Sequence, residues 1–435
     1  TPYEGGSLVH AFLGAFLMSL FGERYEVFSM LSLCYSIGFG VLLYYFMKIF
    51  FDKKAAVLSL ILLALPPTFF TMCTLMVAGN ITESCLLTLL IMFLLFKIIH
   101  SDRHGIFFYF IFGFVCGFSV WFHYVNLIVV VLSWAFLIRY KRKATFTKQF
   151  LIVYTVSFII GFLPWINYNM QHHFLGLNRF KDSFWDGDIT VLNAIKNNLQ
   201  TLSPALFPAV YRFRDVGFIN RKVLAYIYYT ISVFSFIYLL IFERKDRKIK
   251  FILWYIGFYL CIFLITCYGS NVVWAYNDSD DQHLLPVIAF SIITISLMLR
   301  RLSSSLNYFP KIAALILFLC VFTAGYLGNV SLITSKKFLK DAFLSFLEMR
   351  IYGESCDGYA DLAKRYYDGL DERLKAPFTL GLGHEKRCDN KKYPQKEMAR
   401  EYFYYFKDKK GAFTIPITDI IPEKYMPLYF LGMGF

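Results

Sequence analysis

The sequence Met76-Val77-Ala78-Gly79-Asn80-Ile81-Thr82-Glu83-Ser84 separates two apolar runs, 55–76 and 84–99, which predict two helices at or near membrane-spanning length. Its carboxylate, Glu83, comes directly before the second run. A charged side chain costs about 2.5–3.5 kcal/mol at the centre of a membrane helix and less near the interface. Two interpretations of Glu83 follow. It is a functional group held at the membrane surface, or it caps the first turn of a helix, where an acid suits the helix dipole.

The composition predicts an integral membrane protein. Of the 435 residues 57% are hydrophobic, whereas a soluble domain has about 45–50%. The net charge of +14 is typical of Lys and Arg that hold loops on the cytoplasmic side, so we expect no nucleic-acid partner. Most of the nine cysteines lie in or beside apolar runs, and no His or Cys spacing indicates a zinc site. Only Cys356 and Cys388 lie in a polar region, where they could pair in an oxidising compartment or remain free.

Apolar runs of about membrane length recur along the chain, so the predicted class is an all-α polytopic membrane protein. The expected spans are 26–47, 55–76, 84–99, 106–121, 123–139, 149–166, 223–242, 251–268, 284–299 and 311–328. Alternatively, the pair at 106–139 is broken or re-entrant. The shorter run 6–20 predicts a juxtamembrane or partly inserted helix. Because the chain opens at Thr1 inside a polar, glycine-containing turn, we expect one further span before it.

Basic residues predict which ends of the spans face the cytoplasm. They gather at Lys48/Lys53/Lys54, Lys97/Arg103, Arg139/Lys141/Arg142/Lys143, Arg244/Lys245/Arg247/Lys248/Lys250 and Arg300/Arg301. These positions fall on one side if all the spans are real, and that side is expected to be cytoplasmic. The external face then carries 1–25, 77–83, 167–222, 269–283 and the chain after 329.

The chain is expected to have two domains. Residues 1–328 form a transmembrane domain whose largest external loop is 167–222. From 329 to 435 the composition turns polar and contains no run of membrane length. We expect this part to be a small, helical domain on the external side.

Polar residues of the external face form the candidate site. A carboxylate there could act as a general base, orient a sugar or bind a divalent cation, and an Arg could hold a phosphate in a fork. The candidates are Glu4, His10, Asn80, Glu83, His123, Tyr124, Arg212, Arg214, Asp281, Gln282 and His283. Alternatively, His123 belongs to an aromatic belt, Asp281 to a solvated turn, and Arg212 and Arg214 are ordinary loop charges. No visible ligand set supports a metal ion.

Five sequence elements occur in an order that resembles a known family. They are Tyr3-Glu4-Gly5-Gly6-Ser7-Leu8 with Leu20-Phe21-Gly22, Phe50-Phe51-Asp52-Lys53-Lys54-Ala55-Ala56, Leu65-Pro66-Pro67 with Ala78-Gly79-Asn80-Ile81-Thr82-Glu83-Ser84, Gly113-Phe114-Val115-Cys116-Gly117-Phe118-Ser119-Val120-Trp121, and Gln282-His283-Leu284-Leu285-Pro286. Together they resemble the GT-C glycosyltransferases that use polyprenyl-phosphate sugars (glycosyltransferase family 39). These are related to protein O-mannosyltransferases and to the aminoarabinose transferase of lipid A. The resemblance extends over residues 3–330.

The resemblance implies a GT-C-type bundle of about 10 transmembrane helices, or about 11 with one before Thr1. It implies transfer of a sugar, with inversion, from a polyprenyl-phosphate donor to an external glycan, lipid or protein. In this family a carboxylate of the first external loop works with donor and acceptor, and its equivalent would precede Thr1. Glu83 is then the second acidic position of a two-carboxylate site, and Glu4 is a further catalytic candidate. Gln282 stands where the family usually has an Arg.

Two other classes of function compete with this one. A transporter or flippase of lipid-linked glycans would place charges within its spans and repeat its halves. A non-catalytic scaffold that presents the C-terminal domain would not need Glu83 at a buried external interface. Few charges fall within the spans, which favours an enzyme acting at the interface. The match to bacterial patterns predicts a bacterial inner membrane, with the C-terminal domain on the periplasmic or extracellular side.

Overall fold

The computed structural model describes residues 5–22, 25–75, 81–100, 105–145, 147–174, 192, 195–196, 221–265 and 285–334. Every regular element among these residues is helical. The chain divides into two units, Thr1–Thr334 and Ser335–Phe435, and all the described residues belong to the first. The predicted C-terminal domain therefore lies outside the described residues except for its first few, 329–334. Cys356 and Cys388 also lie outside them.

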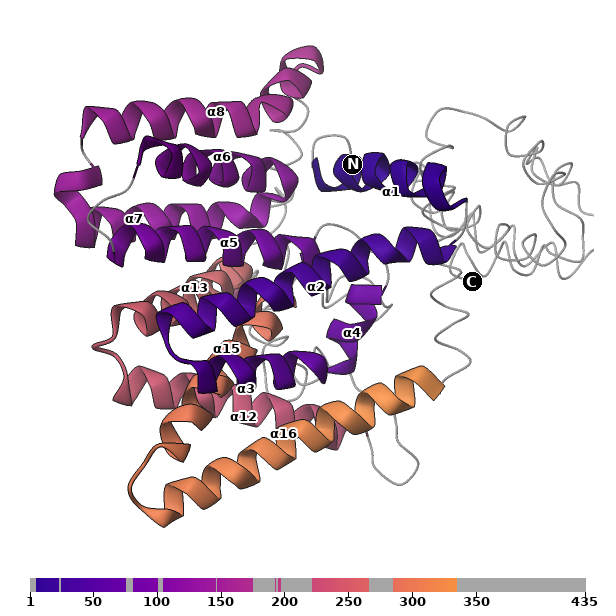
Figure 1. The fold of residues 1–435 in the computed structure, drawn as a ribbon, viewed down its shortest axis with the longest axis vertical. Helices are drawn as coiled ribbons and strands as arrows, with labels where there is room; N and C mark the ends of the chain where they lie inside the picture. Colours follow the sequence, from indigo (N-terminus) through magenta and orange to yellow (C-terminus); the bar gives the residue numbers. More distant parts are fainter. Residues whose placement is uncertain are drawn as a thin grey trace, which may run out of the picture. The chain divides into compact units, whose positions relative to one another are not determined.

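The helices follow the apolar runs of the sequence (Figure 1). They are α1 Gly5–Phe21, α2 Tyr25–Phe50, α3 Lys53–Ala64, α4 Thr68–Leu75, α5 Ile81–His100, α6 Ile106–Phe122, the short 3-10 helix η1 Tyr124–Asn126, α7 Leu127–Thr145, α8 Lys148–Gln171, α12 Arg221–Phe242, α13 Arg247–Ile265, α15 Leu285–Ser303 and α16 Tyr308–Thr334. Within the described ranges, 8 helical segments are long and apolar enough to cross a membrane. The prediction of an all-α integral membrane protein is confirmed.

The predicted single span 55–76 is wrong, because two helices occupy it. Helix α3 ends before Leu65, whose φ of −131° and ψ of 59° are not helical, and α4 begins after Pro67. A proline disfavours the helical conformation of the residue before it and supplies no N–H group. In α16, Asn329 donates to the carbonyl of Pro66 at 2.8 Å, so a carbonyl freed by the break has a partner. The same Asn329 accepts a hydrogen bond from Thr71 of α4.

The predicted pair of spans at 106–121 and 123–139 corresponds to two helices, α6 and α7, with a short turn between them. His123 is extended, with φ −156° and ψ 123°, and η1 follows it. Helix α6 is shorter than a usual span but packs closely on α8. A Cβ atom at Gly117 would collide with the carbonyl oxygen of Phe158, and one at Gly161 with the carbonyl oxygen of Phe114. The small residues let the two backbones approach, as in many membrane helix pairs.

One end of the helical unit carries most of the basic residues. Figure 1 shows the α2–α3, α7–α8, α12–α13 and α15–α16 connections together at this end, which we call the basic end. The predicted clusters at Lys48, Arg139, Arg244 and Arg300 lie in or beside these connections. Which side of a membrane this end faces stays a prediction.

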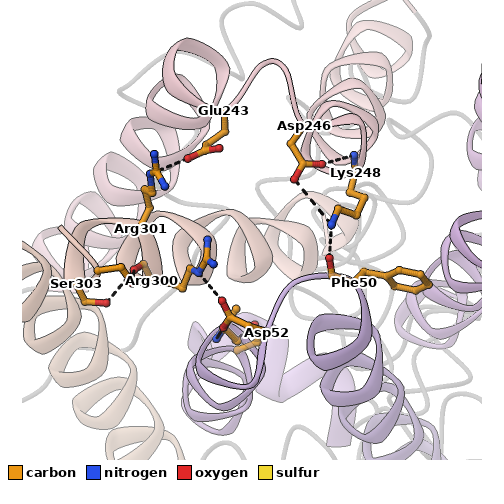
Figure 2. Close-up of polar contacts among 11 residues, drawn as sticks. Phe50, Asp52, Glu243, Asp246, Lys248, Arg300, Arg301 and Ser303 are labelled. Atoms are coloured by element: carbon orange, nitrogen blue, oxygen red, sulfur yellow. Dashed lines mark hydrogen bonds and ion pairs between the residues drawn. The ribbon is translucent and has the colours of Figure 1, made fainter. Parts of the chain in front are cut away.

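Ion pairs tie three of these connections together (Figure 2). Asp52 is the N-cap of α3: it accepts a hydrogen bond from the Ala55 N–H at 2.8 Å and pairs with Arg300 of α15. Between α12 and α15, Glu243 and Arg301 lie 2.9 Å apart. From the start of α13, the Nζ atom of Lys248 donates to the carbonyl of Phe50. Figure 2 shows these contacts as separate links between the turns.

Candidate functional site

Glu83 and His10 form a buried pair between α5 and α1. The Nε2 atom of His10 lies 3.3 Å from the Oε1 atom of Glu83. Glu83 is 1% exposed and His10 is 4% exposed, so water screens this pair little. The contact is within ion-pair distance for a protonated imidazole, but its geometry is not that of a hydrogen bond. Glu83 also lies in the first turn of α5, where an acid suits the helix dipole, and its functional role stays a prediction.

Aromatic side chains from α2 and α6 enclose His10. Its ring meets the rings of Tyr35 and Phe122 edge to face, with centroids 5.5 and 5.8 Å away. The start of α1 fits against α6 because Gly5 has no side chain: a Cβ atom there would collide with the indole of Trp121. The glycine at the start of α1 therefore brings His10 close enough to reach α5.

A second polar cluster fixes the chain beside Glu83. Asn126, in η1, accepts hydrogen bonds from the hydroxyls of Ser84 at 2.8 Å and Thr88 at 2.9 Å. Its amide donates to the Ser119 carbonyl at 2.9 Å. All four residues are buried. The turn between α6 and α7 is thus attached to the first turns of α5, and this attachment limits the movement of Glu83.

Three buried polar atoms of the candidate site lack a hydrogen-bond partner within the described ranges. They are Oε2 of Glu83, Nε2 of His10 and Nδ1 of His123. Burial lowers the pKa of His123 to about 4, so its imidazole is neutral at pH 7. An unsatisfied buried polar group costs about 1–3 kcal/mol, so such groups in one region are typical of a binding site. The carboxylate can accept a proton or hydrogen bond, and the imidazoles can donate or accept one.

The structure brings together only some of the predicted site residues. It pairs His10 with Glu83, and it buries His123 in the turn after α6. Tyr124 accepts a hydrogen bond from the indole Nε1 of Trp165 in α8 at 2.7 Å, which gives it a role in packing. The other candidates lie outside the described residues: Glu4, Asn80, Arg212, Arg214, Asp281, Gln282 and His283.

Sequence reasoning missed Asn126, Tyr35 and the two hydroxyls of Ser84 and Thr88. Asn126 could have been identified as an amide side chain in an otherwise apolar run, because a buried Asn needs several hydrogen-bond partners. For the possible divalent cation, the part of the chain described here contains no group of three or more His, Cys, Asp or Glu side chains that could hold a metal.

The candidate site lies in a part of the chain that matches a known protein family. Residues 6–168 match the family model for dolichyl-phosphate-mannose-protein mannosyltransferase. This match confirms the predicted family resemblance. It covers less than half of the chain, but the matched part includes His10, Glu83, His123 and Tyr124. No curated protein matches the sequence.

Solved structures with a similar arrangement share little sequence with the chain. The apo oligosaccharyltransferase of Archaeoglobus fulgidus is 13% identical, with a TM-score of 0.47, over 83% of this chain and 51% of its own. The present chain thus spans about half the length of that protein. ArnT from Cupriavidus metallidurans, solved with undecaprenyl phosphate bound, is 11% identical, with a TM-score of 0.45, over 97% of this chain and 64% of its own.

Proposed function

We propose that the protein is a membrane glycosyltransferase that moves a sugar from a polyprenyl-phosphate donor to an acceptor outside the cytoplasm. The observation that carries this proposal is the placement of the Glu83–His10 pair within the segment that matches the mannosyltransferase family. The donor enters from the bilayer, and the acceptor is a glycan, lipid or protein. The setting is the bacterial inner membrane, with the region after 329 on the periplasmic or extracellular side.

Glu83 is the carboxylate that we assign to the reaction. Its Oε1 atom faces His10, which holds the carboxylate in one orientation, while Oε2 has no partner in the described part of the chain. Oε2 is therefore available to a hydroxyl of the sugar or of the acceptor. His10 acts as a positioning residue, and the neutral imidazole of His123 is a candidate for binding a sugar hydroxyl.

The reaction is a single displacement at the anomeric carbon. The acceptor hydroxyl gives its proton to a carboxylate, and its oxygen forms a bond with the anomeric carbon. The bond between that carbon and the phosphate oxygen breaks, and the polyprenyl phosphate leaves with the electron pair. Attack from the face opposite the leaving group inverts the configuration. A site shielded from water strengthens the interactions of charged groups with the developing charge.

Replacement of Glu83 by Gln in the full-length protein tests this proposal. Membranes containing the protein are incubated with a panel of radiolabelled undecaprenyl-phosphate sugars, and transfer to membrane and envelope acceptors is measured. The wild type should transfer at least one sugar, and Glu83→Gln should lower that rate about 10²–10⁴-fold, since general base catalysis has this magnitude.

The matched control is Glu243→Gln, which removes a carboxylate that also faces a basic partner but lies at the basic end. This control should transfer at the wild-type rate. Normal transfer by Glu83→Gln would remove Glu83 from the site. A wild type that transfers none of the panel sugars would count against the transferase itself.

A further inference from the structure

Two arginines from different helices flank a single aromatic ring at the basic end. The Cζ atom of Arg139, in α7, lies 5.6 Å from the centroid of Tyr140, and that of Arg247, in α13, lies 4.7 Å from the same centroid. Both arginines are exposed. A ring attracts a cation through its electron-rich face, and because both Cζ atoms lie within 6 Å of one centroid they are at most about 10 Å apart. This arrangement favours an anion that contacts both.

The carboxylates of the nearby connections are already engaged with other cations (Figure 2). Asp52 pairs with Arg300, and Glu243 pairs with Arg301. Asp246, the residue before Arg247, lies 4.0 Å from Lys248 instead. Among the described residues, no carboxylate forms an ion pair with Arg139 or Arg247. With respect to these residues, their positive charge is available to a ligand.

A stripe of side chains continues from Arg247 along one face of α13. Its members are Arg247, Lys250, Trp254 and Phe258, spaced by three, four and four residues, so they share a helix face. The Nζ atom of Lys250 lies 5.6 Å from the Trp254 ring, and the Trp254 and Phe258 rings stack with centroids 5.8 Å apart. Trp254 is 45% exposed and Phe258 is 46% exposed. From the first residue of α13 onward, the stripe therefore presents two charged side chains, then the indole of Trp254, then the phenyl ring of Phe258.

Helix α7 forms the other side of this stripe. The buried Phe136 meets Trp254 at a centroid distance of 6.3 Å, so Trp254 lies at the seam between α7 and α13. Both helices contain membrane-length apolar stretches, Tyr124–Arg142 and Arg247–Ile265. The two arginines lie at the ends of these stretches, which is the level of lipid headgroups.

We propose that the α7–α13 seam is a binding site for an anionic phospholipid. The phosphate lies between Arg139 and Arg247, whose planar guanidinium groups form paired hydrogen bonds with phosphate oxygens. One acyl chain follows Trp254 and Phe258 into the membrane. Basic pockets between membrane helices are typical sites for such headgroups, and the apolar stripe below favours a lipid over a free phosphate.

The test measures lipid binding by the full-length protein with native mass spectrometry. The protein is released from nanodiscs that contain phosphatidylcholine and increasing fractions of phosphatidylglycerol, and bound lipids are counted. The wild type should retain phosphatidylglycerol in preference to phosphatidylcholine. The double variant Arg139→Gln/Arg247→Gln should bind it roughly thirtyfold more weakly, from the usual contribution of two surface cations.

The control Lys54→Gln/Lys311→Gln removes two other exposed cations, one of which lies 5.6 Å from the Tyr308 ring. It should retain phosphatidylglycerol as the wild type does. Equal loss in both double variants, or no preference for phosphatidylglycerol in the wild type, would overturn the proposal. If the first double variant fails to fold, each single arginine variant should show roughly a fivefold loss, and unchanged retention in both refutes the site.

Inorganic phosphate separates the two possible sources of the anion. At a concentration equal to that of the lipid headgroup, it should leave the bound phosphatidylglycerol in place. Complete displacement would exclude a lipid as the occupant. Trp254→Ala should also weaken lipid retention, because it removes the aromatic surface along which the acyl chain lies, and normal retention in this variant would contradict that placement.

Discussion

At the residue scale, the pair formed by His10 and Glu83 bears on stability as well as on the proposed function. A buried carboxylate without its partner is costly, by about 3–5 kcal/mol when one member of a buried pair is removed. Both side chains are buried, and aromatic rings surround His10. A buried ionisable pair that is kept despite this cost is typical of a site that binds a polar substrate.

The coupling of these two residues is a testable property of the folded protein. His10→Phe alone should lower the free energy of unfolding, because it leaves Glu83 buried without its partner. In the Glu83→Gln background the same change should cost less, with a coupling of about 1–3 kcal/mol. Thermal or denaturant unfolding of the four proteins in detergent measures it. Additive effects would show that the 3.3 Å contact contributes nothing.

The charge of Asp52 makes the stability of the protein depend on pH. Burial raises its pKa, but the hydrogen bond from the Ala55 N–H and the charge and hydrogen bond of Arg300 lower it more, so the pKa lies below its usual value of 3.8. A carboxyl with a depressed folded-state pKa stabilises the protein above the pKa of the unfolded chain. That contribution is lost as the pH falls through the folded-state value.

Asp52→Asn tests this linkage, since Asn also serves as an N-cap, while the charge and the second acceptor oxygen, which faces Arg300, are removed. At pH 7 the variant should unfold at a lower temperature than the wild type, by an amount that corresponds to about 1 kcal/mol or less for a partly exposed pair. Below pH 3.8 the difference should shrink. Unfolding temperatures measured in one detergent from pH 7 to pH 3 give the comparison, and a constant difference over this range would contradict the assignment.

At the scale of elements, glycines set the distance between α6 and α8. A Cβ atom at Gly117 meets backbone of α8, which cannot move aside as a side chain can. Gly117→Ala should therefore destabilise the protein by about 1–3 kcal/mol, the usual cost of overpacking. The unfolding temperature in detergent reports the change.

Gly257→Ala on α13 provides the matched control. A Cβ atom at Gly257 would have no described atom within 4 Å, so this change should be neutral or stabilising, because Ala favours a helix by up to about 1 kcal/mol over Gly. If both alanine variants behave alike, close packing of α6 on α8 does not limit stability.

At the scale of the whole molecule, the sequence predicts the order of the helices well and the site less well. Length and apolar character predict most spans, because a membrane imposes both. The division of 55–76 follows from Pro66 and Pro67, but two prolines alone do not show whether a helix bends or breaks. Glu83 and His10 were both candidates by residue type. Their contact was not predictable, since it depends on how α1 packs against α6 and α5.

Asn126 shows the same limit for polar clusters. An Asn in an apolar run can face a partner helix or the headgroup region, and periodicity does not distinguish these. Only the fold brings Ser84, Thr88 and the Ser119 carbonyl to the same amide. The basic residues predicted their own location better. Successive spans alternate in direction, so the order of the spans alone groups the basic connections at one end.

The break between α3 and α4 also has a consequence for biosynthesis. The carbonyl of Pro66 finds its donor in Asn329, and 263 positions separate the two residues. A ribosome that adds about 5–20 residues per second needs roughly 13–53 s to make the intervening chain. During that time the nascent α3–α4 pair lacks this partner in the membrane. Helix α16, the last of the described helices, therefore completes the break between α3 and α4, and a chain that stalls before Asn329 leaves this break exposed to quality control.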